Sequence, residues 1–447
     1  MFALVDANNF YVSCERVFHP RLEGRAVVVL SNNDGCAISR SDEAKALGVR
    51  MGQPMHELRD LERRGDLVAL SANFELYGDL SHRLMTVLGD MAPGQEIYSI
   101  DETFLDVSGL ADRPALGLAM QQRAQRWTGL PVCIGFGPTK TLAKLANHIA
   151  KSAARKPGSY PAKLAGVCDM AAQSPRQQAI LLDATPVAEV WGVGRRLAPQ
   201  MEALGLRTAL DLARADAGVL RKRFSIVLVR TARELAGEPC LPLEDAPPPT
   251  QQVMFSRSFG QAVTDKAVMA EALMAFTASA ATRLRAQGLF CSAVHVMMRT
   301  SPFRPNDAQY RAALTVPLDP TDSSPRLAGA ALAALDALWR PGFDYRKAGV
   351  MLLDLRPAQA PAQADLFAPP PQPPSAAMAA IDAINRRFGR DTVTLGRTTT
   401  GEVRDWQMKQ ARRSPRYTTR LDELRVVGGD AEQSATVNKG LAQAFRP

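Results

Sequence analysis

An apolar, β-prone run over residues 97–107 is interrupted by two adjacent carboxylates, Asp101 and Glu102. Such a run predicts two short strands that meet at a tight turn. A second β-prone run, over residues 2–5, ends in another acid, Asp6. If the two runs pair in one sheet, three carboxylates converge, and their oxygens suit Mg²⁺ together with waters and substrate phosphates. Two such ions can hold the attacking and leaving oxygens of a phosphoryl transfer.

An ordinary turn is the alternative at this place in the sequence. Aspartate in a turn usually satisfies the turn backbone, and Asp101 and Glu102 taken alone fit that use. Asp6 at the end of a strand is a weaker signal still. The choice between a turn and a metal site therefore depends on the segments that follow.

Length and charge limit the class of protein. With 447 residues the chain should divide into three or four domains. Its net charge of +9 and pI of about 9.4 indicate a polyanionic partner, either nucleic acid or an anionic membrane. We expect no membrane span and no signal segment. The six cysteines are scattered and the five histidines lack metal-ligand spacing, which favours a reducing cytoplasm over a disulfide scaffold or a zinc site.

The pattern of segments predicts several domains. Residues 1–165 alternate strands and helices, typical of an α/β core around one sheet. Residues 168–238 read as helical and contain a Gly-x-Gly turn, which can bind phosphate or simply end a helix. After a Pro-Pro-Pro linker, residues 253–355 follow the strand–helix–strand–strand–helix–strand order of a split βαβ domain. A second Pro-rich linker begins at residue 357.

The motifs together resemble the Y-family (translesion) DNA polymerases. Residues 6–11 and 99–102 closely resemble the palm motifs of that family, and its other parts match in one order along the chain. The further matches are the fingers helix (43–49), the palm helix (140–146, ending in Lys151), the thumb helix-hairpin-helix turn (190–196), the little finger (251–356), and segments of the UmuC type, the catalytic subunit of bacterial DNA polymerase V (31–36, 406–409 and 414–420).

The resemblance implies an α/β multidomain, right-hand polymerase with a mixed palm sheet. The expected parts are a palm (1–10 and 71–167), fingers (11–70), a helical thumb (168–238), a linker (239–250), a split-βαβ little finger (251–356), a Pro-rich linker with a clamp-binding peptide (357–376) and a UmuC-type C-terminal region (377–447). Because these parts use up the length of the chain, we expect no proofreading exonuclease.

The resemblance also implies the catalytic residues. Asp6 and Asp101 would hold two Mg²⁺ ions, Glu102 would bind the catalytic ion, and the carbonyl of Ala7 would be a further ligand. The primer 3′-hydroxyl would attack the α-phosphate of a deoxynucleoside triphosphate, and the metals would stabilise the developing charge.

Nucleotide and DNA contacts follow from the same resemblance. Phe10 and Tyr11 would contact the nucleotide, and Tyr11 would exclude a 2′-hydroxyl; a core aromatic in a strand is the alternative for Tyr11. Lys45 and Lys151 would neutralise the triphosphate, although Lys45 cannot bind phosphate bidentately as an arginine would. The alternative for Lys45 is a solvated charge on a helix surface, and the alternative for Lys151 is a cation that stabilises the C-terminal end of a helix. The implied contacts to primer-template DNA are Lys140, Lys144, Gly192, Gly194 and Arg195.

Protein partners and cell location are implied as well. Gln363, Leu366 and Phe367 resemble a sliding-clamp peptide, and the alternative is an incidental apolar pair in a low-complexity linker. The UmuC likeness implies a processed UmuD dimer and RecA as partners, no membrane, and a cytoplasmic, nucleoid-associated location in a bacterium. The expected function is error-prone translesion synthesis in the SOS response.

Two other functions remain open on the sequence. One is a non-catalytic DNA and clamp adaptor, against which the three intact acids argue. The other is a palm-fold nucleotidyl cyclase, in which the Gly-x-Gly turn and the basic domain would have no role. Primer extension, and a reaction with nucleoside triphosphates but no DNA, would separate these functions.

Overall fold

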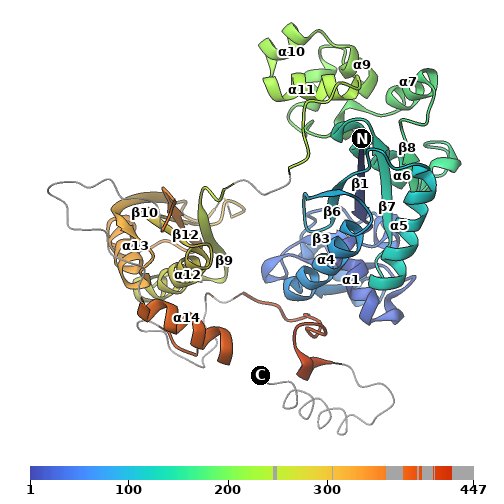
Figure 1. Cartoon of the computed structure of the whole chain (residues 1–447). Helices are drawn as coiled ribbons and strands as arrows, with labels where there is room; N and C mark the ends of the chain where they lie inside the picture. The colour runs from blue at the N-terminus through green and yellow to red at the C-terminus, as the bar shows by residue number, and fades with distance from the viewer. Residues whose placement is uncertain are drawn as a thin grey trace. The chain divides into compact units, whose positions relative to one another are not determined.

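The computed structural model describes residues 1–244, 249–304, 306–358, 376–389, 392–394, 406 and 408–424 (Figure 1). The chain divides into two compact units, each described here by itself. The first comprises Met1–Pro247 and Ala411–Pro447, and the second comprises Pro248–Gln410.

A mixed five-stranded sheet is the centre of the first unit. Its strand order is β5-β6-β1-β7-β8, and the central β1 (Phe2–Ala7) pairs antiparallel with both neighbours. β5 and β6 form the hairpin that the interrupted apolar run predicted. The remaining strands are β5 (Gly94–Ile97), β6 (Glu102–Asp106), β7 (Val132–Gly137) and β8 (Val167–Asp169).

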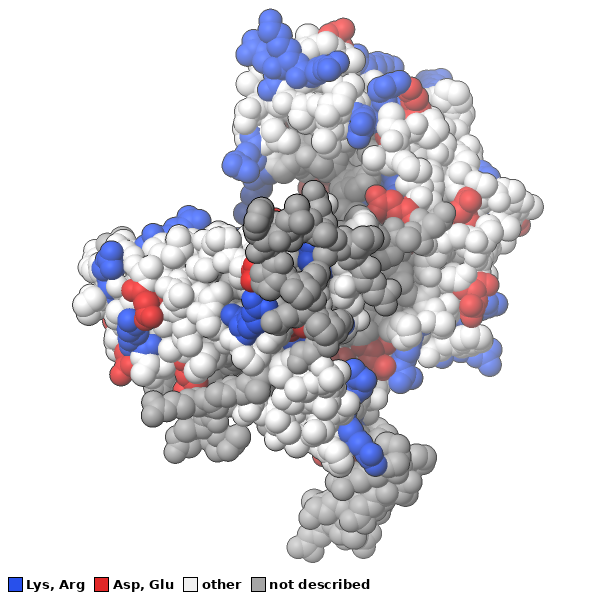
Figure 2. All heavy atoms as spheres, turned by 60° about the vertical axis from the view of Figure 1, so that its left-hand side comes forward, with Lys and Arg blue, Asp and Glu red and all other residues white. Residues whose placement is uncertain are grey.

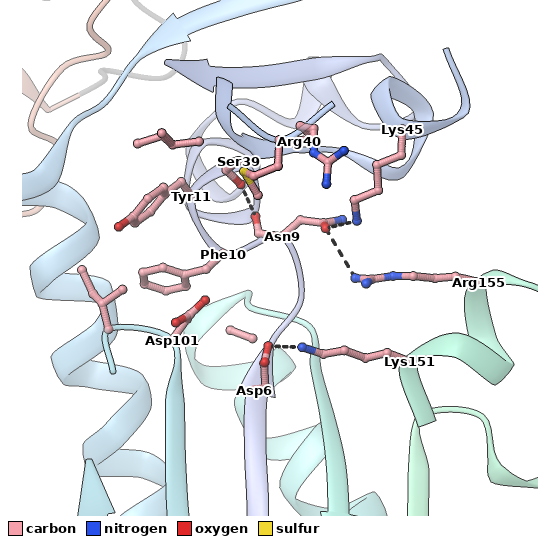
Figure 3. A pocket seen from close by; sticks show the side chains of 14 residues that line it. Asp6, Asn9, Phe10, Tyr11, Ser39, Arg40, Lys45, Asp101, Lys151 and Arg155 are labelled. Carbon is pink, nitrogen blue, oxygen red and sulfur yellow. Dashed lines mark hydrogen bonds and ion pairs between the residues drawn. The ribbon is translucent and has the colours of Figure 1, made fainter. Parts of the chain in front are cut away.

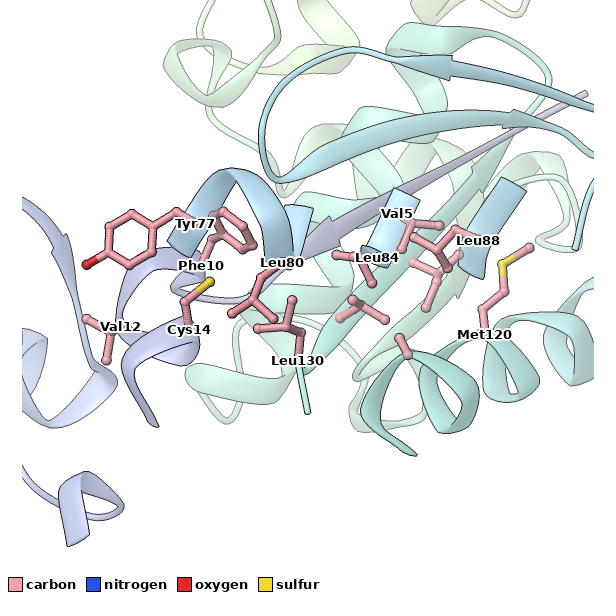
Figure 4. Close-up of a cluster of buried hydrophobic side chains, with 14 of the residues drawn as sticks. Val5, Phe10, Val12, Cys14, Tyr77, Leu80, Leu84, Leu88, Met120 and Leu130 are labelled. Carbon is pink, nitrogen blue, oxygen red and sulfur yellow. The ribbon is translucent and has the colours of Figure 1, made fainter. Parts of the chain in front are cut away.

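Helices cover both faces of this sheet. Alternate residues of its strands point to opposite sides, and apolar residues on both sides pack against helices. Ala3 and Val5 belong to a buried cluster that includes Leu84 and Met120 of the helices on one face (Figure 4). Leu4 lies on the other face, against α6. The covering helices are α4 (Phe74–Gly89) and α5 (Arg113–Thr128) on the first face and α6 (Lys140–Arg155) on the second.

Two glycines let α6 approach β7 closely. A Cβ atom at Gly135 would lie 2.1 Å from the backbone nitrogen of Asn147, and one at Gly137 would lie 2.5 Å from that of Ala143. The Asn147 amide then donates to the Cys133 carbonyl at 2.7 Å. The close approach brings the side chains of α6 over the end of the sheet.

A smaller three-stranded sheet occupies the segment predicted as fingers. Its order is β3-β2-β4, with β2 antiparallel to β3 and parallel to β4, so β4 is an edge strand. β2 is entirely buried. The elements of this part are α1 (Phe10–Phe18), β2 (Val27–Leu30), β3 (Ala37–Arg40), α2 (Asp42–Ala46), α3 (Met55–Arg63) and β4 (Val68–Ser71).

The helical segment predicted as the thumb is fixed to α6 by one buried acid. Glu234 accepts hydrogen bonds from the backbone N–H and the hydroxyl of Thr141 at 3.0 and 2.6 Å, and from the N–H groups of Cys240 and Leu241. The helices are α7 (Pro175–Asp183), α8 (Ala198–Glu202), α9 (Ala209–Arg214), α10 (Ala217–Arg223) and α11 (Ile226–Leu235).

The second unit has the predicted split βαβ order. Its antiparallel sheet, β11-β10-β12-β9, packs one face against two helices. The elements in chain order are β9 (Val253–Val263), α12 (Lys266–Ala286), β10 (Leu289–Arg299), β11 (Arg311–Thr321), α13 (Ser324–Leu338) and β12 (Tyr345–Leu353).

Part of the C-terminal region also belongs to the second unit. Asp382 of α14 (Ala376–Phe388) accepts two hydrogen bonds from Arg285 of α12, at 2.6 and 2.9 Å. Trp406 packs edge-on against Phe276 at a ring separation of 5.6 Å. Within the described residues, no helix has the length and apolar character needed to cross a membrane.

Candidate active site

A cavity of about 370 Å³ opens where β1 ends and α1 begins (Figure 3). Its walls come from β1, α1, β3, α2 and α6, and from the turn before β6. Seven predicted site residues line it: Asp6, Ala7, Phe10, Tyr11, Lys45, Asp101 and Lys151. The lining residues not predicted from the sequence are Asn9, Ile38, Ser39, Arg40, Met51, Ile100 and Arg155.

Two carboxylates meet at the end of the sheet. Asp6 and Glu102 are register partners on β1 and β6, so their side chains project from the same face. Burial raises the pKa of Asp6 to about 7; Lys151 opposes this rise, and a hydrogen bond with Glu102 adds to it. Burial also disfavours ionisation of Glu102, but hydrogen bonds with Asp6 and Lys144 outweigh it and lower the pKa of Glu102. The pair is therefore placed to share a proton or a cation.

Two lysines of α6 face this acid pair. Lys144 donates to Glu102 at 2.7 Å, and Lys151 forms an ion pair with Asp6. The lysines are seven residues apart, close to two helical turns, so both point from the face of α6 that lies toward the sheet. The Lys144 ammonium also lies 4.4 Å from the ring centre of Tyr98. Each acid thus has its own cation on one rigid helix.

Asp101 lies apart from the pair. Its carboxylate accepts a hydrogen bond from the Ser99 hydroxyl at 2.7 Å, and it lies on the side of Phe10 (Figure 3). Its carbonyl accepts a hydrogen bond from the Ala7 N–H at 2.9 Å, which holds the turn against β1. The described residues contain no group of three acidic, histidine or cysteine side chains arranged to hold a metal ion. The structure thus brings two of the three predicted carboxylates together and places Asp101 on the cavity wall.

Another wall of the cavity is basic. Lys45 donates to the Asn9 side-chain oxygen at 2.6 Å, and Arg155 approaches the same oxygen at 3.4 Å. Arg40 of β3 lines the cavity beside them. Neither arginine was predicted from the sequence. Arg155 follows Lys151 by four residues on a helix, and this spacing would have placed the two on one face.

Tyr11 lies in the first turn of α1 and lines the cavity. Its ring stacks on Tyr77 of α4 with a centroid separation of 4.6 Å and an interplanar angle of 19°. The preceding residue, Phe10, is buried, with its ring 5.7 Å from that of Tyr11. A half-buried position in a helix does not match the alternative of a core aromatic in a strand.

The thumb turn presents three of the predicted DNA contacts to solvent. Gly192, Gly194 and Arg195 are exposed ahead of α8, and Gly192 has the positive φ of 88° that favours glycine. Arg195 also lines a second cavity, of about 500 Å³, together with Arg40 and Arg50. Figure 2 shows Lys and Arg side chains gathered at the top of the view, over the helices of this segment.

The other two predicted DNA contacts are engaged within the first unit. The Lys140 side chain is 4% exposed and forms an ion pair with Glu96, which also accepts the Glu244 N–H at 2.7 Å. Because this charge is buried, the structure argues against a DNA contact by Lys140. Lys144 is 20% exposed and its ammonium is directed at Glu102.

Three cations lie in a row across the sheet of the second unit. Lys347 of β12 is the register partner of Arg299 on β10, and Arg299 is the partner of Arg311 on β11. Val296 and Val350 each lie three positions from a cation on the same strand, so they point to the opposite face of the sheet. Both valines belong to the core under the helices, and the row of cations therefore lies on the face away from the helices. None of the three has an ion pair within the described residues. Like charges placed directly opposite are destabilising, and an anionic ligand would relieve their repulsion.

The predicted clamp contacts, Gln363, Leu366 and Phe367, lie outside the described residues.

Comparison with known proteins identifies the family. Residues 5–148 match the impB/mucB/samB family, residues 250–366 match its C-terminal domain, and residues 375–427 match a domain of unknown function. The chain is 44% identical to "Protein UmuC" of Salmonella typhimurium, over 95% of this chain and 99% of that protein. It is 27% identical to "DNA polymerase IV 1" of Halalkalibacterium halodurans, over 88% and 92%.

Solved structures show the same fold. A Y-family DNA polymerase chimera, Dbh-Dpo4-Dbh, superposes with a TM-score of 0.61 at 20% identity, over 79% of this chain and 99% of the chimera. A Dbh ternary complex superposes with a TM-score of 0.52 at 20% identity, over 79% and 98%. The chain therefore belongs to the impB/mucB/samB family, the UmuC-like group of Y-family DNA polymerases.

Proposed function

We propose that this chain adds deoxynucleotides to a primer end on template DNA, without proofreading, and copies damaged templates with low fidelity in the SOS response. The observation that carries the proposal is the cavity at the end of β1, where the carboxylates of Asp6 and Asp101 and a basic wall face one space, with Glu102 paired to Asp6. Acidic groups suit metal-bound phosphates, and a basic wall suits a triphosphate. Membership of the UmuC-like group supports the same reaction.

Asp6, Glu102 and Asp101 are the residues that would hold the divalent cations, which we take to be two Mg²⁺ ions. The donors fit, because all three are carboxylates. Glu102 is half-buried and pairs with the buried Asp6, and a cation would offset the repulsion between the two acids. Bound Mg²⁺ would stabilise the charge that develops on the transferring phosphoryl group. The Ala7 carbonyl, at the end of β1, remains a predicted further ligand.

The basic wall is assigned to the triphosphate. Lys45 and Lys151 supply point charges, and Arg155 and Arg40 add the planar guanidinium groups that can bind phosphate bidentately. Tyr11 would pack against the sugar of the incoming nucleotide and reject a 2′-hydroxyl by steric clash. Its position on the cavity wall, stacked on a buried ring, supports this role.

Primer-template DNA would be bound mainly through its phosphates. The row formed by Lys347, Arg299 and Arg311 has the spacing of adjacent strands and no acidic partners among the described residues, and the exposed turn at Gly192 and Gly194 can offer backbone N–H groups. We propose the sliding clamp, a processed UmuD dimer and RecA as protein partners, with the enzyme in the bacterial cytoplasm at the nucleoid.

Primer extension tests the proposal directly. The chain is given a primer annealed to an undamaged template, or to one with an abasic site, together with Mg²⁺ and deoxynucleotides, with and without the proposed partners. Extension on both templates is expected. DNA binding without any extension would favour the adaptor, and a cyclic product formed without DNA would favour the cyclase.

A further inference from the structure

Residues 411–424, within the domain of unknown function, return to the first unit and cover a sheet edge. Arg413 forms a parallel bridge with Ser71, the last residue of the edge strand β4. The Ser71 N–H donates to the Arg412 carbonyl at 3.1 Å, and the Ser71 hydroxyl accepts from the Arg412 N–H at 2.9 Å. The segment therefore satisfies backbone groups that an open edge would leave unpaired.

A buried polar contact lies next to this edge. The Asn73 amide, on a residue 1% exposed, donates to the Ser414 hydroxyl and carbonyl, both at 3.0 Å, and to the Pro415 carbonyl at 3.1 Å. The Ser414 hydroxyl donates to Glu15 at 3.0 Å. Glu15 is 0% exposed, and a carboxylate at such depth requires hydrogen-bond donors. The C-terminal segment supplies one of them.

The second donor to Glu15 leads to the active-site cavity. The Tyr77 hydroxyl donates to the same Glu15 oxygen at 2.6 Å. Tyr77 is fully buried in α4, and its ring is the one on which Tyr11 stacks. A continuous path of contacts thus runs from Ser414 through Glu15 and Tyr77 to Tyr11.

An aromatic anchor holds the segment to the same helices. Tyr417 is 2% exposed and stacks on Phe18 of α1 at a centroid separation of 4.6 Å and an angle of 14°. Arg416 forms an ion pair with Glu75 of α4 at 3.3 Å. α1 carries Tyr11, and α4 carries the ring beneath it, so the segment contacts both helices that hold the stacked pair.

We propose that residues 411–424 are a positioning element for sugar selection. Docked on α1 and α4, the segment holds Tyr77 through Glu15, and Tyr77 in turn fixes the ring of Tyr11 at the cavity. The inference rests on the proposed function, in which Tyr11 rejects a 2′-hydroxyl. A ring that selects by clash must keep its place, since a ring free to tilt opens the space that it should fill.

Three full-length variants interrupt this path at different points. Ser414→Ala removes the hydroxyl that donates to Glu15 but keeps the backbone carbonyls to which Asn73 donates. Tyr77→Phe removes the hydrogen bond to Glu15 but keeps the ring on which Tyr11 stacks. Tyr417→Ala removes the aromatic ring that anchors the segment on Phe18. Arg412→Ala is the matched control, because it removes only a partly exposed ion pair with Glu62. The measurement is the ratio of deoxynucleotide to ribonucleotide incorporation efficiency on one primer-template.

We expect each of the three variants to lower this ratio about fivefold or more, the order of one lost hydrogen bond, through faster ribonucleotide addition. Deoxynucleotide addition should change less than twofold, and Arg412→Ala should match the parent. In a Tyr11→Ala background the same three changes should leave the ratio unaltered, because the ring that they position is gone. An equal drop in both backgrounds would indicate general loosening and would overturn the proposal.

The outcomes also separate this inference from the proposed function. If Tyr11→Ala relaxes sugar selection but the three path variants keep the parental ratio, the positioning role is refuted and the role of Tyr11 stands. If Tyr11→Ala itself leaves the ratio unchanged in a chain that extends primers, sugar rejection by Tyr11 and this inference both fail.

Hydrogen exchange checks docking without any activity. Tyr417→Ala should speed amide exchange at Ser71 and Tyr77 at least tenfold relative to the Arg412→Ala control. Parental protection in Tyr417→Ala, together with a lowered sugar ratio, would show that the ratio does not depend on docking and would overturn the proposal.

Discussion

Replacing Arg299 by Gln should weaken DNA binding and, at the same time, stabilise the second unit. Arg299 is the middle cation of the row and has a register partner of like charge on each side, Lys347 and Arg311. A residue retained for folding would not show these opposite effects. A residue that pays a stability cost to bind phosphate should show both.

The size of each effect follows from the geometry. On duplex DNA each phosphate contact contributes about 0.9 to the slope of log affinity against log salt, so Arg299→Gln should reduce the slope by about 0.9. Replacing all three cations should reduce it by about 2.7. Relief of two like-charge contacts should raise the free energy of unfolding by about 0.5–1 kcal/mol at low salt, and screening should shrink this gain as salt rises.

Two titrations on the same protein measure these effects. Fluorescence anisotropy of labelled primer-template DNA gives the salt slope, and urea unfolding of the second unit at low and high salt gives the stability. Arg326→Gln on α13 is the control for the salt slope, because it makes the same charge change on a helix that packs on the other face of the sheet; it also removes an ion pair with Asp319 at 3.2 Å. An unchanged slope together with reduced stability in Arg299→Gln would refute the reasoning.

Three further predictions concern single sites. Tyr11→Ala should lower the ratio of deoxynucleotide to ribonucleotide incorporation by roughly 10- to 200-fold, the worth of one small group in a fitted pocket, as measured by single-nucleotide insertion. Lys140→Met should lower the free energy of unfolding by about 3 kcal/mol, because it leaves the largely covered acid Glu96 without its cation. The salt slope of DNA binding should not change, and a lower slope would restore Lys140 as a DNA contact. Replacing Leu366 and Phe367 with Ala should abolish clamp binding in a pull-down and spare single-nucleotide insertion, and loss of insertion would contradict a tethered clamp peptide.

Much of the fold could be predicted because its long elements have clear periodicity. The split βαβ domain and the hairpin of β5 and β6 were predicted from alternation and turn residues, and both are confirmed. The short α1, α3 and β3 were not predicted. Asn9 takes a left-handed backbone conformation, with φ of 51°, so the chain changes from strand to helix within two residues and α1 begins almost directly after β1.

The candidate site could be predicted as a set of residues but not as an arrangement. Asp101 and Glu102 are adjacent, but Asp101 lies in the turn before β6 and only Glu102 belongs to the strand, where it pairs with Asp6. Lys140 of α6 carries the charge expected of a DNA contact, but its partner Glu96 lies on β5, 44 residues earlier in the chain. Contacts of this kind depend on tertiary packing, which local sequence patterns do not report.

The role of the C-terminal segment was equally hidden from the sequence. Ser414 and Glu15 are separated by 399 residues, and no local pattern connects them. Burial of an acid beneath a distant hydroxyl is visible only once the chain has folded. No pattern in the sequence predicted that Tyr417 and Ser414 are buried.

Primer extension by the acid variants tests the central claim most directly. Asp6→Asn, Glu102→Gln and Asp101→Asn each remove one negative charge with little change of shape. Each should slow nucleotide addition at least about a hundredfold, a few kcal/mol of transition-state stabilisation, while DNA affinity stays near the parental value. Near-parental extension by all three variants would contradict a carboxylate-bound metal site at the end of β1.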